Sequence, residues 1–331
     1  MAKIKFVIGI LISILFLDLA LRNIDFRIVL NSFKSIDLKY LALCIVFQFA
    51  SLSCRAYLWK NILSYEKDAR YSHLFEALLI GYMGNNILPF RMGEAMRAYT
   101  IGKKEEMSRT LAFASVILER LIDLFVLLSF FLTLVFFIDL ERWVVLSGMV
   151  VFVFLLIVIL IFYALAYDFL RIPSKLYYNI IRYIPESLIG TMERIAGSFL
   201  KGIKLIKNFR QALWLVFLSL LTWVLWTAIL YFGLKAFHLD LPITASLLLA
   251  VVVNIGVMVP SSPGFIGVFQ YLCVISLAFF NIPKEIAFSF SFLVHTVQYL
   301  PTTALGWFYL TRMQIRSYRA LKEELRQIPL S

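Results

Sequence analysis

Charged residues are scarce in this 331-residue chain. Asp, Glu, Lys and Arg make up only 16% of it, whereas 62% of the residues are hydrophobic and the mean hydropathy is +0.87. A soluble domain of this length needs more polar surface to cover its core. The composition excludes a water-soluble globular protein and predicts an all-α, polytopic helical membrane bundle.

Cysteine and the common site motifs are also lacking. The three cysteines lie in apolar stretches without metal-like spacing, so we expect neither a disulfide framework nor a zinc site. The three histidines lie far apart and fit no ligand or triad motif, which favours packing or interfacial roles. No Walker-type sequence is present, which argues against ATP hydrolysis. We therefore expect no metal, no cofactor and no catalytic residue. The residues concerned are Cys44, Cys54, Cys273, His73, His238 and His295.

The formal charge of +12 does not indicate nucleic acid. The basic residues are scattered through short loops and segment ends, where positive-inside topology and contact with anionic lipid explain them. The connection 168–210 carries eight Lys and Arg against three acids, so we expect it to be cytoplasmic. Its apolar stripe predicts an amphipathic helix, either on an anionic leaflet or packed under the bundle.

Apolar runs predict about six to eight membrane segments within a single domain, 1–331. The first run follows Lys3 and Lys5 and resembles a signal sequence, but it has no clear small-residue cleavage site and is interpreted as a retained helix. Residues 22–37 suit a short interfacial helix, and 312–331 a basic cytoplasmic tail. The predicted segments are 6–21, 38–63, 73–88, 110–138, 143–167, 211–237, 242–280 and 286–310.

Six ionisable residues lie where the chain could enter the bilayer. A charge near the bilayer centre costs at least ~2.5 kcal/mol, so such groups usually face a protein interior or a wet cavity. We expect a substrate site; the alternatives are a structural ion-pair network or a cytoplasmic loop. Helical spacing puts the first three near one face and the two later acids on another. In order they are Arg91, Glu94, Arg97, Glu119, Arg120 and Asp123. Arg55, in the segment 38–63, either faces the bundle or snorkels.

Two apolar runs of the chain are interrupted in a similar way. Each has an apolar run, a Pro, and a Gly four residues later: Pro89 with Gly93, and Pro260 with Gly264. Such breaks at matching places in two halves indicate an inverted repeat with its site at the midplane. The loop charges favour a first interruption that re-enters from the cytoplasm; the competing topology has 73–89 spanning fully and the N-terminus outside.

Three blocks carry a resemblance to a known family: ILPFRMGEAMR, SVILERLIDL and VPSSPGFIGVFQ. They resemble the signature blocks of the lysylphosphatidylglycerol synthase/flippase membrane-domain family. The resemblance implies a domain that moves lipids between leaflets. Only a short tail follows the last predicted span, so we expect no aminoacyl-transferase domain. Gln270 departs from the acid expected in the second half. By matching positions the functional core is Asn86, Pro89, Arg91, Gly93, Glu94, Arg97, Glu119, Arg120 and Asp123, with Pro260, Pro263, Gly264 and Gly267 in the other half.

The sequence therefore predicts a flippase that moves a phospholipid or lipid-linked headgroup. The arginines would bind phosphate, while the acids neutralise them or bind an amino group. Proton coupling through Glu119 or Asp123 and passive exchange are both left open. Two other functions are also left open. One is a membrane enzyme that acts on a lipid-linked sugar or phosphate with one of these acids as base, and the other is a transporter of a small anionic solute. We expect membrane lipids as the partners and the cell membrane as the location. A homo-oligomer and a separate lipid-modifying enzyme are both possible partners on the sequence alone.

Overall fold

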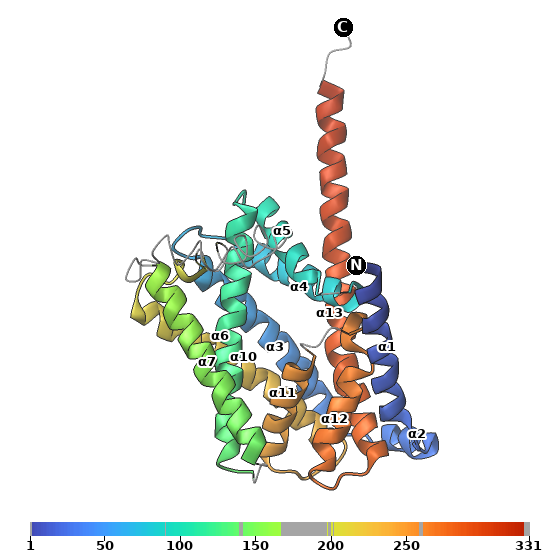
Figure 1. Ribbon diagram of the computed structural model, residues 1–331. Coiled ribbons are helices and arrows are strands. Elements are labelled where there is room, and N and C mark those ends of the chain that lie inside the picture. Colours follow the sequence, from blue (N-terminus) through green and yellow to red (C-terminus); the bar gives the residue numbers. More distant parts are fainter. Residues whose placement is uncertain are drawn as a thin grey trace.

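The computed structural model describes residues 2–89, 91–138, 142–166, 197, 200, 202–257 and 261–327. These residues are mostly helical and contain no strand, which confirms the all-α prediction (Figure 1). Two of the described helices, α3 and α10, are long and apolar enough by themselves to cross a membrane. The elements are α1 (Ala2–Leu21), α2 (Phe26–Lys34), α3 (Leu38–Leu63), α4 (Tyr71–Ile87), α5 (Gly93–Lys104), α6 (Arg109–Val135), α7 (Arg142–Ala166), α10 (Phe209–Ala236), α11 (Ile243–Gly256), the 3-10 turn η1 (Pro263–Phe265), α12 (Val268–Ala278) and α13 (Lys284–Gln327).

The chain builds the same order of elements twice. A long helix, two short helices and a second long helix occur as α3 to α6 and again as α10 to α13. The first helices of the two units, α3 and α10, pack side by side and antiparallel. Asp37 N donates to Ala236 O (3.0 Å) at one end, and Trp214 Nε1 donates to Asn61 Oδ1 (3.1 Å) at the other. The expected inverted repeat is therefore present in the order and direction of the helices.

The first pair of short helices, α4 and α5, forms a hairpin. Glycines let the two backbones touch: a Cβ on Gly93 would lie 1.9 Å from Gly81 O. The turn is held by Asn85 Oδ1, which accepts a hydrogen bond from Gly93 N (2.9 Å). Both ends of the hairpin therefore lie where α3 ends and α6 begins, the upper side in Figure 1. The predicted re-entrant hairpin is confirmed and a full span over 73–89 is wrong, whereas its entry from the cytoplasm stays a prediction.

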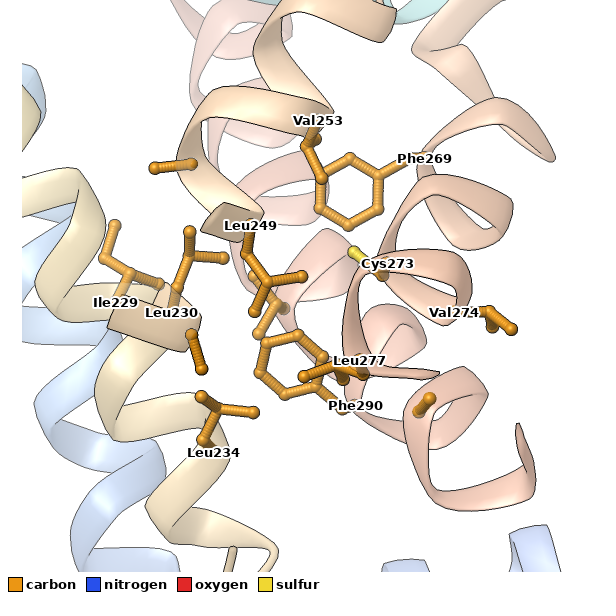
Figure 2. Close-up of a cluster of buried hydrophobic side chains, with 14 of the residues drawn as sticks. Ile229, Leu230, Leu234, Leu249, Val253, Phe269, Cys273, Val274, Leu277 and Phe290 are labelled. Atoms are coloured by element: carbon orange, nitrogen blue, oxygen red, sulfur yellow. The ribbon is translucent and has the colours of Figure 1, made fainter. Parts of the chain in front are cut away.

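The second hairpin, α11 and α12, begins where α10 ends, on the lower side. Its arms pack through Leu249 and Val253 of α11 against Phe269, Cys273 and Leu277 of α12, in a core completed by α10 and α13 (Figure 2). The turn between the arms needs glycine, since Gly264 and Gly267 have φ of 68° and 90°. The two hairpins thus enter the bundle from opposite sides.

The tips of the two hairpins meet inside the bundle. Tyr299 Oη of α13 donates to Asn86 O at the end of α4 (3.3 Å), and the same ring lies against Gly264, where a Cβ would approach to 2.6 Å. The first helix, α1, covers this second break from outside, because Ser262 N donates to Ser13 Oγ (2.7 Å). The two breaks are therefore packed against each other, while Ile87, Met92 and Ile266 beside them keep exposed surface.

One boundary prediction differs from the structure, and two further predictions fall on residues that the structure does not describe. The last span was expected to end at 310, but α13 is one helix of 44 residues that continues through Pro301 to Gln327. At 1.5 Å per residue it is about 66 Å long, roughly twice the hydrocarbon thickness, and its end projects beyond the other helices (Figure 1). Residues 168–196 of the predicted amphipathic connection, together with Pro260, lie outside the described residues.

Candidate functional site

Glu119 of α6 is the centre of the buried charges. Its side chain is 0% exposed. Oε1 accepts hydrogen bonds from Arg55 Nη1 of α3 (3.0 Å), Arg97 Nη1 of α5 (3.1 Å) and Arg120 Nη2 (2.7 Å). Oε2 accepts a further one from Arg97 Nη2. One carboxylate therefore joins the long helix, the re-entrant hairpin and α6.

Asp123, one turn further along α6, extends the cluster to α10. Its Oδ2 accepts from Arg55 Nη1 (2.5 Å) and lies 3.4 Å from Arg120 Nη1. Its Oδ1 accepts from Ser219 Oγ (2.9 Å) and Trp223 Nε1 (3.1 Å), both on α10. These bonds cover both oxygens, so Asp123 ties the two halves of the chain together.

Arg97 is held from both sides. Its guanidinium lies 3.8 Å from the ring centroid of Trp59, and Trp59 Nε1 in turn donates to Ser115 Oγ (2.8 Å). Because Gly81 has no side chain, α4 can pack directly on the Arg97 side chain. Arg97 is 2% exposed and its Nε has no hydrogen-bond partner among the described residues. It has no freedom to move without breaking this packing.

Glu94 and Arg120 form the more accessible edge of the cluster. Their side chains are 21% and 36% exposed, and Arg120 Nε lies 3.7 Å from Glu94 Oε1. Glu94 Oε2 also lies 3.9 Å from Arg97 Nη1. The cluster therefore has a buried part around Glu119 and a half-exposed part where a ligand could exchange partners.

Arg91 behaves differently from the expectation. It precedes α5, with a left-handed φ of 51°, so it does not share a helical face with Glu94 and Arg97 as the spacing predicted. Its Nη2 donates to Val257 O of the second break (3.1 Å), and its guanidinium lies 5.4 Å from the Phe265 ring centroid. No carboxylate of the described residues forms an ion pair with it. Within the described part of the chain, Arg91 is thus a cation between the two hairpin tips that forms no close ion pair with a carboxylate.

Arg55 is the site residue that sequence reasoning left undecided. It is 7% exposed and bonded to both Glu119 and Asp123, so the snorkelling alternative is wrong. Its position deep inside an apolar helix was the available signal. With Arg55 included, four arginines accompany three carboxylates, a formal charge of +1.

The remaining predicted residues belong to the helix breaks. Asn86 does not approach the carboxylates; its Nδ2 donates to Thr303 Oγ1 (2.8 Å) and Thr302 Oγ1 (3.2 Å) of α13. In the second break Gln270, where an acid was expected, accepts from Gly267 N (2.8 Å), and its Nε2 lies 2.9 Å from His295 Nδ1. Pro89 lies in the turn between α4 and α5, and Pro263 begins η1.

Comparison with known proteins agrees with this architecture. Residues 6–306 match the family described as the lysylphosphatidylglycerol synthase TM region. The chain belongs to this family. The similar proteins are also named as membrane proteins. One UPF0104 membrane protein from Methanocaldococcus jannaschii is 27% identical over 93% of this chain and 95% of its own length. A second from the same organism is 26% identical over 70% of this chain and 95% of its own length.

A more distant similarity is partial. The glycosyltransferase AglD of Haloferax volcanii is 29% identical over 38% of this chain, but the match covers only 20% of AglD. The family match and the UPF0104 relatives identify an integral membrane protein of a family named for the membrane region of a lipid synthase.

Proposed function

We propose that this member of the family moves a phosphate-bearing lipid headgroup between the leaflets. The observation that carries the proposal is Arg91, which forms no close ion pair among the described residues and lies at the meeting point of two oppositely inserted hairpins, near the partly exposed Arg120 and Glu94. A headgroup must otherwise cross ~30 Å of hydrocarbon, and charged groups at that depth are costly unless they act on a ligand or on one another.

The charge balance favours a ligand with negative charge. The formal charge of the cluster is +1, and Arg91 donates only to a neutral carbonyl among the described residues. A phosphate could take Arg91 and Arg120 as charge-assisted donors, with bidentate geometry where both N-H edges face it. Glu94 would then accept an amino or hydroxyl group of the headgroup. A zwitterionic, sugar-phosphate or aminoacylated lipid suits such a site.

The enzyme alternative rests on the partial similarity to a protein named glycosyltransferase AglD. It requires a carboxylate that is free to take a proton from a substrate. All four oxygens of Glu119 and Asp123 instead accept hydrogen bonds or ion pairs from protein donors. Glu94 is the one acid of the cluster with exposed surface and without a strong donor, and it would have to serve as the base. The geometry therefore favours binding over proton abstraction.

The test is leaflet exchange of headgroup-labelled phosphatidylethanolamine in liposomes containing the purified protein, with and without a pH gradient. Arg91→Gln should reduce the exchange rate about tenfold or more, because it removes the cation that pairs with no carboxylate. Arg142→Gln, an exposed site at the start of α7, is the matched control and should exchange at the wild-type rate. No exchange by wild type, or full exchange by Arg91→Gln, would contradict the proposal. Competition by a soluble phosphate ester without lipid would favour the solute alternative.

The charge distribution supports a cytoplasmic upper side in a cell membrane. The ends of α3, α5 and α6 on that side carry the basic residues Lys60, Lys67, Arg70, Lys103, Lys104 and Arg109. Short loops rich in Lys and Arg stay in the cytoplasm. The end of α13 projects from the same side, so the C-terminus would also be cytoplasmic. Labelling of single cysteines introduced at 67 and at 240 by an impermeant reagent would test this orientation.

A further inference from the structure

We infer that Tyr99 and Arg109 form an outer phosphate-binding site for the lipid, at the upper end of the seam between α5 and α6. The inference rests on the proposed function, because it assigns the place where the headgroup binds before it reaches Arg120 and Arg91. It starts from an arginine that the buried cluster does not use.

Arg109 is an exposed cation stacked on an aromatic ring. Its guanidinium lies over the ring of Tyr99 of α5, 4.8 Å from the centroid. No Asp or Glu of the described residues forms an ion pair with it. A guanidinium stacked on an aromatic face keeps its N-H edges in one plane and free to donate, which is the geometry that phosphate oxygens accept. The stacked guanidinium of Arg109 is therefore available to bind an anion.

The pair lies on the same seam as the candidate site. Tyr99 with Arg109 and Glu94 with Arg120 are both contacts between α5 and α6, at successive levels of the same antiparallel pair. Arg120 follows Arg109 after about three turns of α6, roughly 16 Å along the axis and on nearly the same face. The two arginines thus mark the two ends of one path.

The surface between these ends suits a lipid. Tyr99 and Phe113 are 45% and 38% exposed, so aromatic surface flanks the seam for acyl chains. Arg109 begins α6 at the end that lies on the upper side in Figure 1, and we place the headgroups of the upper leaflet at this level. Between these ends, α5 carries no Asp or Glu from Tyr99 back to Glu94, and α6 carries none from Arg109 to Glu119, so the charge of these stretches is complementary to an anionic group. The occupant that fits is a phospholipid of the upper leaflet, with its phosphate on Arg109 and its chains against Phe113.

Two measurements on the full chain test this site. In phosphatidylcholine liposomes with increasing fractions of labelled phosphatidylethanolamine, Arg109→Gln should raise the half-saturating lipid fraction about tenfold and leave the maximal exchange rate unchanged. In native mass spectrometry, the same variant should retain less phosphatidylglycerol, while retention of diacylglycerol, which lacks the phosphate, stays at the wild-type level. Added inorganic phosphate should compete weakly; full competition would show a site for free phosphate and overturn the lipid assignment.

The controls separate this inference from the proposed function. Arg210→Gln removes an exposed arginine on the same side, at the start of α10, and should change neither readout. Arg109→Lys, which keeps the charge but loses the planar fork, should be intermediate, and Tyr99→Leu should resemble it. If wild type exchanges lipid and Arg109→Gln is normal in both measurements, the outer site is wrong. If wild type exchanges no lipid but Arg109→Gln still loses phosphatidylglycerol, the outer site stands and the flippase proposal fails.

Discussion

Replacing Glu119 by Gln should destabilise the protein more than any other single charge removal in the cluster. The carboxylate is 0% exposed and its two oxygens accept four hydrogen bonds from three arginines. Without it, Arg55, Arg97 and Arg120 share only Glu94 and Asp123, and one buried positive charge is left uncompensated. Breaking a buried pair on one side costs about 3–5 kcal/mol. That corresponds to a factor of roughly one hundred to several thousand in the ratio of folded to unfolded protein.

Reversible unfolding in lipid bicelles, followed by the fluorescence of the buried tryptophans, measures this cost. Asp240→Asn is the control: it also removes one carboxylate from one ion pair, but in an exposed turn, and it should leave the stability unchanged. The double variant Arg97→Met/Glu119→Leu restores charge balance and should cost less than the sum of the two single changes. A Glu119→Gln protein as stable as wild type would refute the view that this carboxylate holds α3, α5 and α6 together.

Three further changes test the packing around the site. Gly93→Ala should prevent closure of the α4 and α5 hairpin and lower the free energy of unfolding by about 1–3 kcal/mol or more through overpacking. The control Gly197→Ala, whose added Cβ meets open space, should be neutral or stabilising, and thermal unfolding compares the two variants. Trp59→Phe removes a buried hydrogen bond and weakens the contact with the guanidinium, so it should lower the free energy of unfolding by about 1–2 kcal/mol, while Trp214→Phe, half exposed, should change it little. Asn86→Leu should loosen the packing of α4 on α13 by a similar amount, seen as faster hydrogen exchange of residues 80–87.

Local patterns were sufficient for most helices. Leu38–Leu63 was predicted to the residue, because an apolar run bounded by polar ends defines both a span and a helix. The same reasoning failed for α13. Hydropathy locates the point where a helix leaves the hydrocarbon, whereas the helix itself can continue beyond that point, as α13 does to Gln327. The span was therefore predicted and the full helix was not.

The residues of the site could be predicted from the sequence, but the ion pairs between them could not. Intramembrane charge was enough to select Glu119, Arg120 and Asp123, whereas the partners of Arg55 lie 64 and 68 residues away, and no local spacing reports such a contact. Arg91 was misplaced because its spacing from Glu94 was taken as helical. The chain in fact adopts a left-handed conformation there, two residues after Pro89.

The peripheral helix α7 sets the direction in which the second half of the chain runs through the bundle. It packs on α6 in the antiparallel direction, with Phe152 against Phe125 and Gly148 against Phe131. The first four-element unit crosses the bundle an even number of times, so it begins and ends on the same side. Had α10 followed α6 directly, the second unit would have inserted in the orientation of the first. One extra crossing reverses the direction in which the second half is threaded during synthesis. Among the described residues, α7 packs on α6 and forms no hydrogen bond or ion pair with a candidate site residue, yet it determines that the two halves run in opposite directions.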